Sequence, residues 1–171
     1  MSHVNEEKVF YGESVVYLSV LSKDEFLKTQ EVPTTVHAFP INNNKILATV
    51  NQRGVDIIGG HIEGNETPEE ALKRECMEEG YIIPLEFEII GAIKVDNRDN
   101  DNLKYPKIGY QLFYVIKKYE ELEFKSEFES IERSLLTKKE FSNSHHNWLN
   151  VHTHLLEVAT KDFKNKKTLK P

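Results

Sequence analysis

The stretch GGHIEGNETPEEALKRECMEEGYI, residues 59–82, decides how the rest of the chain is interpreted. After a glycine pair and a polar turn, it predicts a helix over residues 68–79. Thr67 can cap this helix, a proline suits its first position, and Glu70, three residues after Thr67, completes a capping box. The helix should end at Gly80, because a glycine readily takes the left-handed turn that closes a helix.

The carboxylates of this helix are placed unlike those of an ordinary surface helix. Glu75, Glu78 and Glu79 stand at positions i, i+3 and i+4, so their side chains project to one side as close neighbours. This spacing costs roughly a few tenths of a kcal/mol per pair, and the negative end of the helix dipole disfavours the same side chains. Residues 60–80 hold seven acidic and two basic residues, so a charge of −5 out of the chain's −6 is concentrated there.

Two interpretations of this acidic cluster remain open from spacing alone. A clustered all-oxygen site with room for water and a phosphate substrate suits Mg²⁺, with Mn²⁺ as the alternative. A bound metal would also let a phosphate approach, because it inverts the negative local field. Lys73 and Arg74 favour the other interpretation, in which they pair with the glutamates on a solvent-exposed face.

The remaining sequence predicts an α/β fold. Segments rich in Val, Ile, Tyr and Phe predict strands over residues 14–20, 35–41, 45–51, 55–62, 85–95 and 108–117. Apolar residues recur at helical spacing over about residues 148–162, which predicts a second helix. We therefore expect a single domain over residues 1–171, with a mixed β-sheet sandwiched between helices and a short basic C-terminal tail from about residue 160.

Composition excludes several classes of protein. No apolar run approaches the roughly 18 residues of a membrane span, and the first eight residues lack the features of a secretory signal. The single cysteine, Cys76, cannot form an internal disulfide, and we expect it to be a buried apolar residue. The spacing of His145, His146, His152 and His154 fits no ordinary set of zinc ligands. We expect a cytoplasmic protein with no membrane partner.

Residues 59–82 resemble the Nudix box, the signature of the MutT-like Nudix hydrolases. The box reads Gly, five residues, Glu, seven residues, Arg-Glu, an aliphatic residue, any residue, Glu-Glu, any residue, Gly and an aliphatic residue. The chain matches it without a gap at Gly60, Glu66, Arg74, Glu75, Glu78, Glu79 and Ile82. Tyr81 replaces the closing glycine, and we interpret Gly80 as the helix stop moved by one residue. The resemblance implies the Nudix-type α/β/α sandwich.

The resemblance also implies a reaction, the metal-dependent hydrolysis of a pyrophosphate bond in a nucleoside diphosphate linked to another moiety. In this reaction a metal-bound water attacks phosphorus. Carried over to matching positions, Glu75 is the key metal-binding carboxylate and a candidate base, and Glu78 and Glu79 are metal ligands. Arg74 would orient a carboxylate by pairing. Gly60, or the glycine before it, would bring a backbone carbonyl to the Mg²⁺ or Mn²⁺ ion.

Further candidate residues lie outside the helix. Glu63 and Glu66 are expected to support the loop before it. Many family members place another carboxylate after the long strand that follows the box, where the chain offers Glu127, Glu129, Glu132 and, further on, Glu140. We favour Glu129 or Glu132 as a residue near the substrate, with an exposed acidic loop as the alternative. Arg53 is a candidate contact for substrate phosphate, with a solvated turn as the alternative.

Two other functions are compatible with the same scaffold. A non-catalytic nucleotide-sensing or partner-binding domain is the main alternative, although such domains typically lose box carboxylates that are all present here. Isomerisation of a prenyl diphosphate would need an active-site cysteine, and Cys76 inside the helix is poorly placed for that role. We expect a small nucleotide-type substrate and no nucleic-acid partner. The sequence leaves open which nucleotide derivative is used and whether the protein is a monomer or a homodimer.

Overall fold

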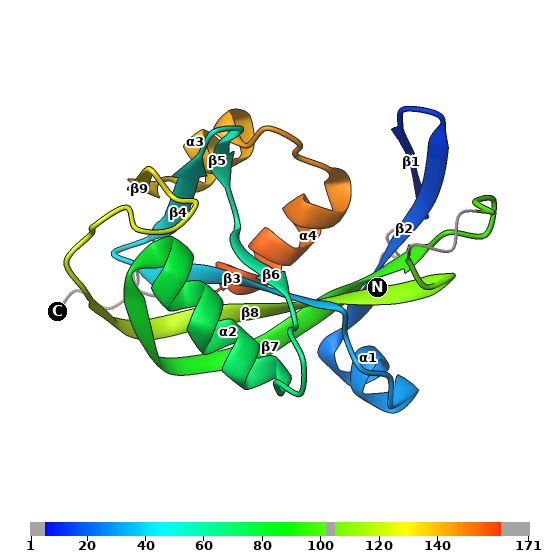
Figure 1. The fold of residues 1–171 in the computed structure, drawn as a ribbon, viewed down its shortest axis with the longest axis horizontal. Helices are drawn as coiled ribbons and strands as arrows, with labels where there is room; N and C mark the ends of the chain where they lie inside the picture. The colour runs from blue at the N-terminus through cyan, green and yellow to red at the C-terminus, as the bar shows by residue number, and fades with distance from the viewer. Residues whose placement is uncertain (1–5, 102–104, 162–171) are drawn as a thin grey trace, which may run out of the picture.

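The computed structural model describes residues 6–101 and 105–161 (Figure 1). The described elements are, in chain order, β1 (Glu7–Tyr11), β2 (Ser14–Ser22), α1 (Lys23–Thr29), β3 (Thr35–Asn42), β4 (Lys45–Asn51), β5 (Gly54–Asp56), β6 (Ile58–His61), α2 (Pro68–Glu75), the π-helical turn η1 (Cys76–Gly80), β7 (Ile82–Asp96), β8 (Ile108–Glu121), β9 (Glu132–Leu136), α3 (Lys138–Ser144) and α4 (Asn150–Ala159). Within these described residues, the structure contains no helix of the length and apolar character that crossing a membrane requires.

The strands form one mixed sheet. Its order is β1-β2-β7-β8-β3-β4-β5, with β6 also paired to β3 and β9 to β4. The neighbours β3 and β8 run parallel, and the other strand pairs described here are antiparallel. The central pairing places β6, with its two glycines, beside β3 in the middle of the molecule.

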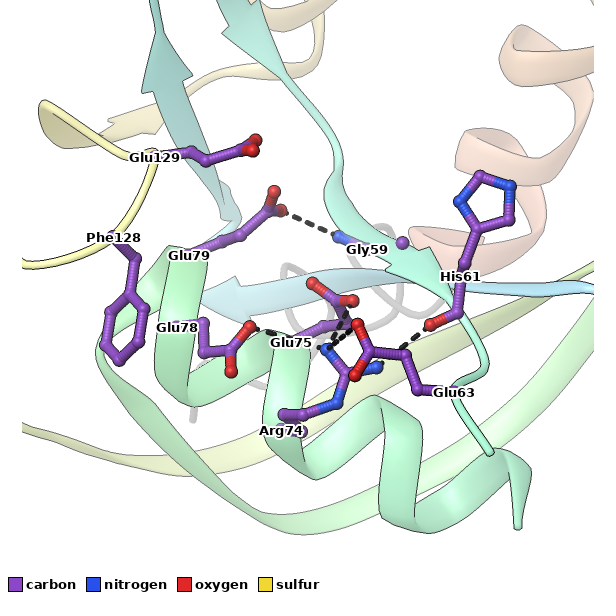
Figure 2. Close-up of a pocket in the computed structure, with 10 residues that line it drawn as sticks. Gly59, His61, Glu63, Arg74, Glu75, Glu78, Glu79, Phe128 and Glu129 are labelled. Atoms are coloured by element: carbon purple, nitrogen blue, oxygen red, sulfur yellow. Dashed lines mark hydrogen bonds and ion pairs between the residues drawn. The ribbon is translucent and has the colours of Figure 1, made fainter. Parts of the chain in front are cut away.

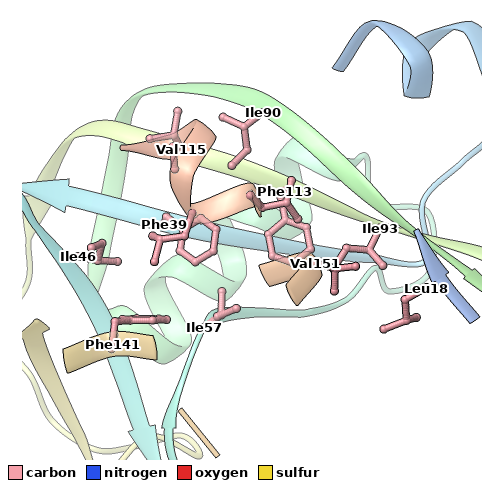
Figure 3. Close-up of a cluster of buried hydrophobic side chains, with 14 of the residues drawn as sticks. Leu18, Phe39, Ile46, Ile57, Ile90, Ile93, Phe113, Val115, Phe141 and Val151 are labelled. Atoms are coloured by element: carbon pink, nitrogen blue, oxygen red, sulfur yellow. The ribbon is translucent and has the colours of Figure 1, made fainter. Parts of the chain in front are cut away.

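Helices cover both faces of this sheet. Side chains alternate between faces along a strand, so Leu112, Tyr114 and Ile116 of β8 pack in the core beneath α2. Phe113 and Val115 point the other way, into a second core closed by α3 and α4 (Figure 3). In Figure 1, α2 lies on one side of the band formed by β3, β8 and β7, and α4 lies on the other. The predicted α/β/α sandwich is confirmed.

Several elements differ from the sequence-based prediction. The segment 55–62 is two strands, because β5 pairs with β4 whereas β6 turns away to pair with β3. The prediction missed β1, β9, α1 and α3, which are all seven residues or shorter. The second predicted helix is present but shorter, as α4. Most of the predicted basic tail, residues 162–171, lies outside the described residues.

The end of the acidic helix also differs from the prediction. Tyr81, and not Gly80, takes the left-handed conformation, with φ 49° and ψ 48°. The wide turn η1 keeps Gly80 within the helical segment, where a Cβ would lie 2.7 Å from Ile58 Cδ1. The helix stop is therefore not moved by one residue. A tyrosine in this conformation costs roughly 1–2 kcal/mol relative to a glycine.

Candidate functional site

A cavity of about 500 Å³ lies between β6, the segment α2–η1 and the loop that joins β8 to β9 (Figure 2). Its described lining residues are Gly59, Gly60, His61, Glu63, Arg74, Glu75, Glu78, Glu79, Phe128 and Glu129. The structure thus brings together the predicted metal ligands, the predicted orienting arginine and one of the two favoured outer carboxylates. Five of these described lining residues are glutamates, so the cavity is strongly acidic.

Glu75 lies at the centre of this site because α2 approaches β6 closely. The residue is 8% exposed. A Cβ on Gly60 would collide with the Glu75 carboxylate, so this approach requires a glycine. Pairing of Gly60 with Val36 of β3 holds the strand in place. The geometry therefore sets a buried carboxylate directly against the backbone of the glycine strand.

Arg74 organises the surrounding carboxylates. Its Nε and one terminal nitrogen donate to the two oxygens of Glu66 at 2.6 and 3.0 Å. The same guanidinium donates to Glu75 Oε1 at 2.7 Å, to the His61 carbonyl at 2.9 Å and to Glu78 Oε2 at 3.4 Å. The hydrogen bonds from Arg74 lower the pKa of Glu66 to about 2. Arg74 therefore pairs with the glutamates, as the second interpretation expects, but in a largely buried setting, because its side chain is 19% exposed and that of Glu75 is 10% exposed.

The cavity holds more negative charge than Arg74 can balance. Burial raises the pKa of Glu79 to about 8, against the hydrogen bond of 2.9 Å that the Gly59 N–H donates to its carboxylate. The charges of Glu75, Asp56 and Glu129 raise it further. Burial also raises the pKa of Glu75, although Arg74 opposes the shift. Clustered carboxylates of this kind suit a hard divalent cation such as Mg²⁺, which takes oxygen ligands.

Two predicted residues are not brought to the cavity. Arg53, whose side chain is 68% exposed, pairs with Asp56 at 3.1 Å. Glu132 begins β9 and accepts a hydrogen bond from Ser134. Conversely, the sequence-based reasoning missed Phe128, which lines the cavity beside Glu129 but belongs to an irregular segment without periodicity.

Cys76 is fully buried in the core beneath α2. Burial raises the pKa of its thiol. The expected apolar role is confirmed, since a protonated and inaccessible thiol is a poor nucleophile.

Two of the four histidines of the C-terminal region do meet an acidic residue. The Nε2 atoms of His145 and His146 each lie 3.1 Å from a different oxygen of Asp56, and their spacing could accommodate a metal ion. However, the Asn147 N–H donates to His145 Nδ1 at 3.0 Å, so Nε2 carries the proton and donates to Asp56. The described geometry favours hydrogen bonds from the two histidines to Asp56, which join the loop after α3 to β5. The other two histidines are not part of this group.

A match to a family model identifies the family of this chain. A family model described as the NUDIX domain matches residues 32–167. The chain belongs to the Nudix family. The predicted family is confirmed, and the predicted enzyme class, a hydrolase acting on pyrophosphate bonds, agrees with this membership.

Solved structures resemble this Nudix protein over most of their length. A mutant form of the pyrophosphohydrolase BsRppH of Bacillus subtilis has a TM-score of 0.65 and 22% identity, with 98% of this chain and 100% of that chain covered. An ADP compounds hydrolase has a TM-score of 0.55 and 13% identity, with 98% of this chain and 96% of that chain covered. MutT, studied from Aliivibrio salmonicida and Vibrio cholerae, has a TM-score of 0.53 and 16% identity, with 77% of this chain and 99% of that chain covered. At these identities the likeness shows the fold. No curated protein sequence matches the chain.

Proposed function

We propose that this Nudix protein is a metal-dependent hydrolase that cleaves a pyrophosphate bond in a nucleoside diphosphate linked to another moiety. The observation that carries this proposal is the partly buried cavity in which Glu75, Glu78 and Glu79 lie beside β6, the strand that contains Gly59 and Gly60. Among the similar structures, the name pyrophosphohydrolase supports the kind of bond that is cleaved, and the name ADP compounds hydrolase supports the substrate class.

The lining residues fit a divalent cation. Glu75, Glu78 and Glu79 would hold Mg²⁺ or Mn²⁺, and the backbone carbonyl of Gly60 or Gly59 is a further candidate ligand. When bound, such an ion screens the charge of phosphate oxygens and lowers the pKa of a bound water. The surplus of carboxylates supports this assignment, because a cation would offset their mutual repulsion.

The chain's own residues position the reacting groups. In hydrolysis, a water oxygen forms a bond to phosphorus, and the bond from phosphorus to the bridging oxygen breaks with its electron pair leaving on that oxygen. Glu75 is the proposed acceptor of the water proton. Its carboxylate is held by Arg74 at 2.7 Å and by its close packing on Gly60, so it needs no rearrangement to act.

A substrate panel tests this proposal. Phosphate or nucleotide release would be measured with and without Mg²⁺ for nucleoside triphosphates, including oxidised ones, nucleotide sugars and dinucleoside polyphosphates. We expect turnover of at least one class, and only with metal. Absence of turnover together with absence of metal-dependent thermal stabilisation would overturn the proposal. Tight nucleotide binding without turnover would instead favour a non-catalytic nucleotide-sensing domain.

A further inference from the structure

Tyr81 occupies a position at which the chain carries an unfavourable residue. Its backbone is left-handed, and a non-glycine residue is strained in this region. The preceding residue is a glycine that does not use its freedom in this way. Strain of this kind persists where surrounding contacts compensate for it. The contacts of Tyr81 therefore indicate which interactions compensate for its backbone strain.

Those contacts are made to the loop between β8 and β9, residues 122–131. Tyr81 is 4% exposed, and its ring centroid lies 4.7 Å from that of Phe124 and 6.2 Å from that of Phe128. Its hydroxyl oxygen accepts the Glu127 N–H at 2.7 Å, and its carbonyl accepts the Leu122 N–H at 2.7 Å. One residue thus binds the loop at its start and again in its middle.

The same loop is also fastened to the end of η1 near its far end. The carbonyls at a helix C-terminus lack intrahelical partners. Here Ser130 Oγ donates to the Glu79 carbonyl at 2.9 Å. Arg133, in β9 just after the loop, donates to the carbonyls of Gly80 and Tyr81 at 3.0 and 2.9 Å. The loop and the acidic end of the helix therefore form one hydrogen-bonded unit.

This unit delivers a carboxylate to the cavity. Glu129 lies between Glu127, which is bonded to the Tyr81 hydroxyl, and Ser130, which is bonded to the Glu79 carbonyl. In Figure 2 the Glu129 side chain extends from the loop toward that of Glu79. Both side chains line the cavity. The position of Glu129 thus depends on anchors on either side of it.

We propose that Tyr81 is a positioning residue that fixes the loop 122–131 so that Glu129 faces Glu79 across the cavity. This inference rests on the proposed function, because Glu129 matters for turnover only if the carboxylates hold the catalytic ion. Tyr81 itself is not among the described residues that line the cavity. It acts through Glu129, and that dependence separates it from a residue that merely stabilises the fold.

A double-mutant cycle tests the proposal. Tyr81→Phe removes the hydroxyl that accepts the Glu127 N–H, Tyr81→Gly also removes the ring and the backbone strain, and Glu129→Gln removes the carboxylate. Each would be made alone, and Tyr81→Phe also in the Glu129→Gln background. Tyr114→Phe is the matched control, since it removes the hydroxyl of a buried tyrosine that packs on Phe87.

Three quantities would be measured well below the melting temperature: kcat with saturating Mg²⁺, the dissociation constant for Mn²⁺, and hydrogen exchange of the Glu127 amide. We expect Tyr81→Phe to lower kcat about tenfold, as expected for a displaced functional group, and to speed exchange of the Glu127 amide. Tyr81→Gly should lower kcat further. In the Glu129→Gln background, Tyr81→Phe should have no additional effect on kcat or on Mn²⁺ binding.

Equal effects of Tyr81→Phe in the two backgrounds would overturn the proposal, because they would show a purely structural role. Unchanged exchange of the Glu127 amide, or wild-type kcat in Tyr81→Gly, would overturn it as well. A wild-type protein that hydrolyses no substrate would refute the proposed function separately. In that case the exchange data and the Mn²⁺ cycle would still decide whether Tyr81 positions Glu129.

Discussion

Arg74 connects more of the acidic site than any single carboxylate does. It donates hydrogen bonds to three glutamates and to the carbonyl of His61 through one planar group. Arg74→Lys keeps the charge but cannot reproduce the forked geometry. We expect it to lower the unfolding free energy by about 1–3 kcal/mol and kcat by about tenfold or more.

Urea unfolding and steady-state kinetics would measure these two effects. Arg53→Lys is the matched control, because Arg53 is largely exposed and pairs with a single carboxylate. Its unfolding free energy should change by less than about 0.5 kcal/mol. An Arg74→Lys protein that matches this control in both measurements would contradict the role given to Arg74.

Glu79 should give the metal-free protein an unusual dependence on pH. Its pKa in the folded state is about 8, above its ordinary value of 4.5, so the folded state binds more protons than the unfolded state between these values. The contribution of Glu79 to stability is therefore full below about pH 4.5 and is lost as pH rises toward 8, by up to about 1.4 kcal/mol per pH unit.

Glu79→Gln should remove this loss of stability. Urea unfolding in chelator between about pH 5 and 8 would show it, and parallel curves for the two proteins would contradict the prediction.

At the scale of elements, the site depends on how closely α2 packs against β6. Gly60→Ala places a methyl group where the Glu75 carboxylate lies. We expect the carboxylate to be displaced, with Mn²⁺ affinity and kcat each reduced about tenfold or more. Calorimetric titration with Mn²⁺ measures the first effect. Gly109→Ala is the control, since a Cβ there lies 3.6 Å from its nearest neighbour; equal affinities in the two variants would be inconsistent with this account.

Elements with strong local signals could be predicted from the sequence. The start of α2 follows from its proline and from the capping box of Thr67 and Glu70. The same box precedes α1 at Ser22 and α3 at Thr137. These two helices of seven residues are too short to show a helical period. The capping box was therefore the main feature of the sequence from which they could have been predicted.

Features set by tertiary contacts could not be predicted in this way. Glu129 and Glu132 are three residues apart in the sequence, but Glu129 lies in the loop and lines the cavity, whereas Glu132 begins β9. The left-handed Tyr81 accepts a hydrogen bond from the same loop, a contact between residues 46 positions apart in the sequence. The proximity of Glu75, Glu78 and Glu79, by contrast, could be predicted from their spacing, because residues three and four positions apart are neighbours on a helix, and all three line the cavity.

At the scale of the whole molecule, the layer between the sheet and α4 should limit stability in acid. Burial lowers the pKa of His37 to about 4 and that of His152 to about 3, from 6.5. The unfolded state therefore binds more protons below pH 6.5, and stability should be lost as pH falls from 6.5 toward 4. His152→Asn, which retains an acceptor for the Leu149 N–H, should reduce this loss by up to about 1.4 kcal/mol per pH unit. Unfolding curves in that range would test this, and equal acid sensitivity of variant and wild type would refute it.

The central claim is that the glutamates of the cavity form a catalytic metal site with Glu75 at its centre. Glu75→Gln keeps the size of the side chain and an oxygen for Arg74 but removes the charge. We predict that Mg²⁺-dependent kcat on the best substrate falls by about 10²-fold or more, while thermal unfolding without metal is unchanged or slightly improved. Glu132→Gln, outside the cavity, should keep wild-type kcat. A Glu75→Gln protein as active as the wild type would contradict the account.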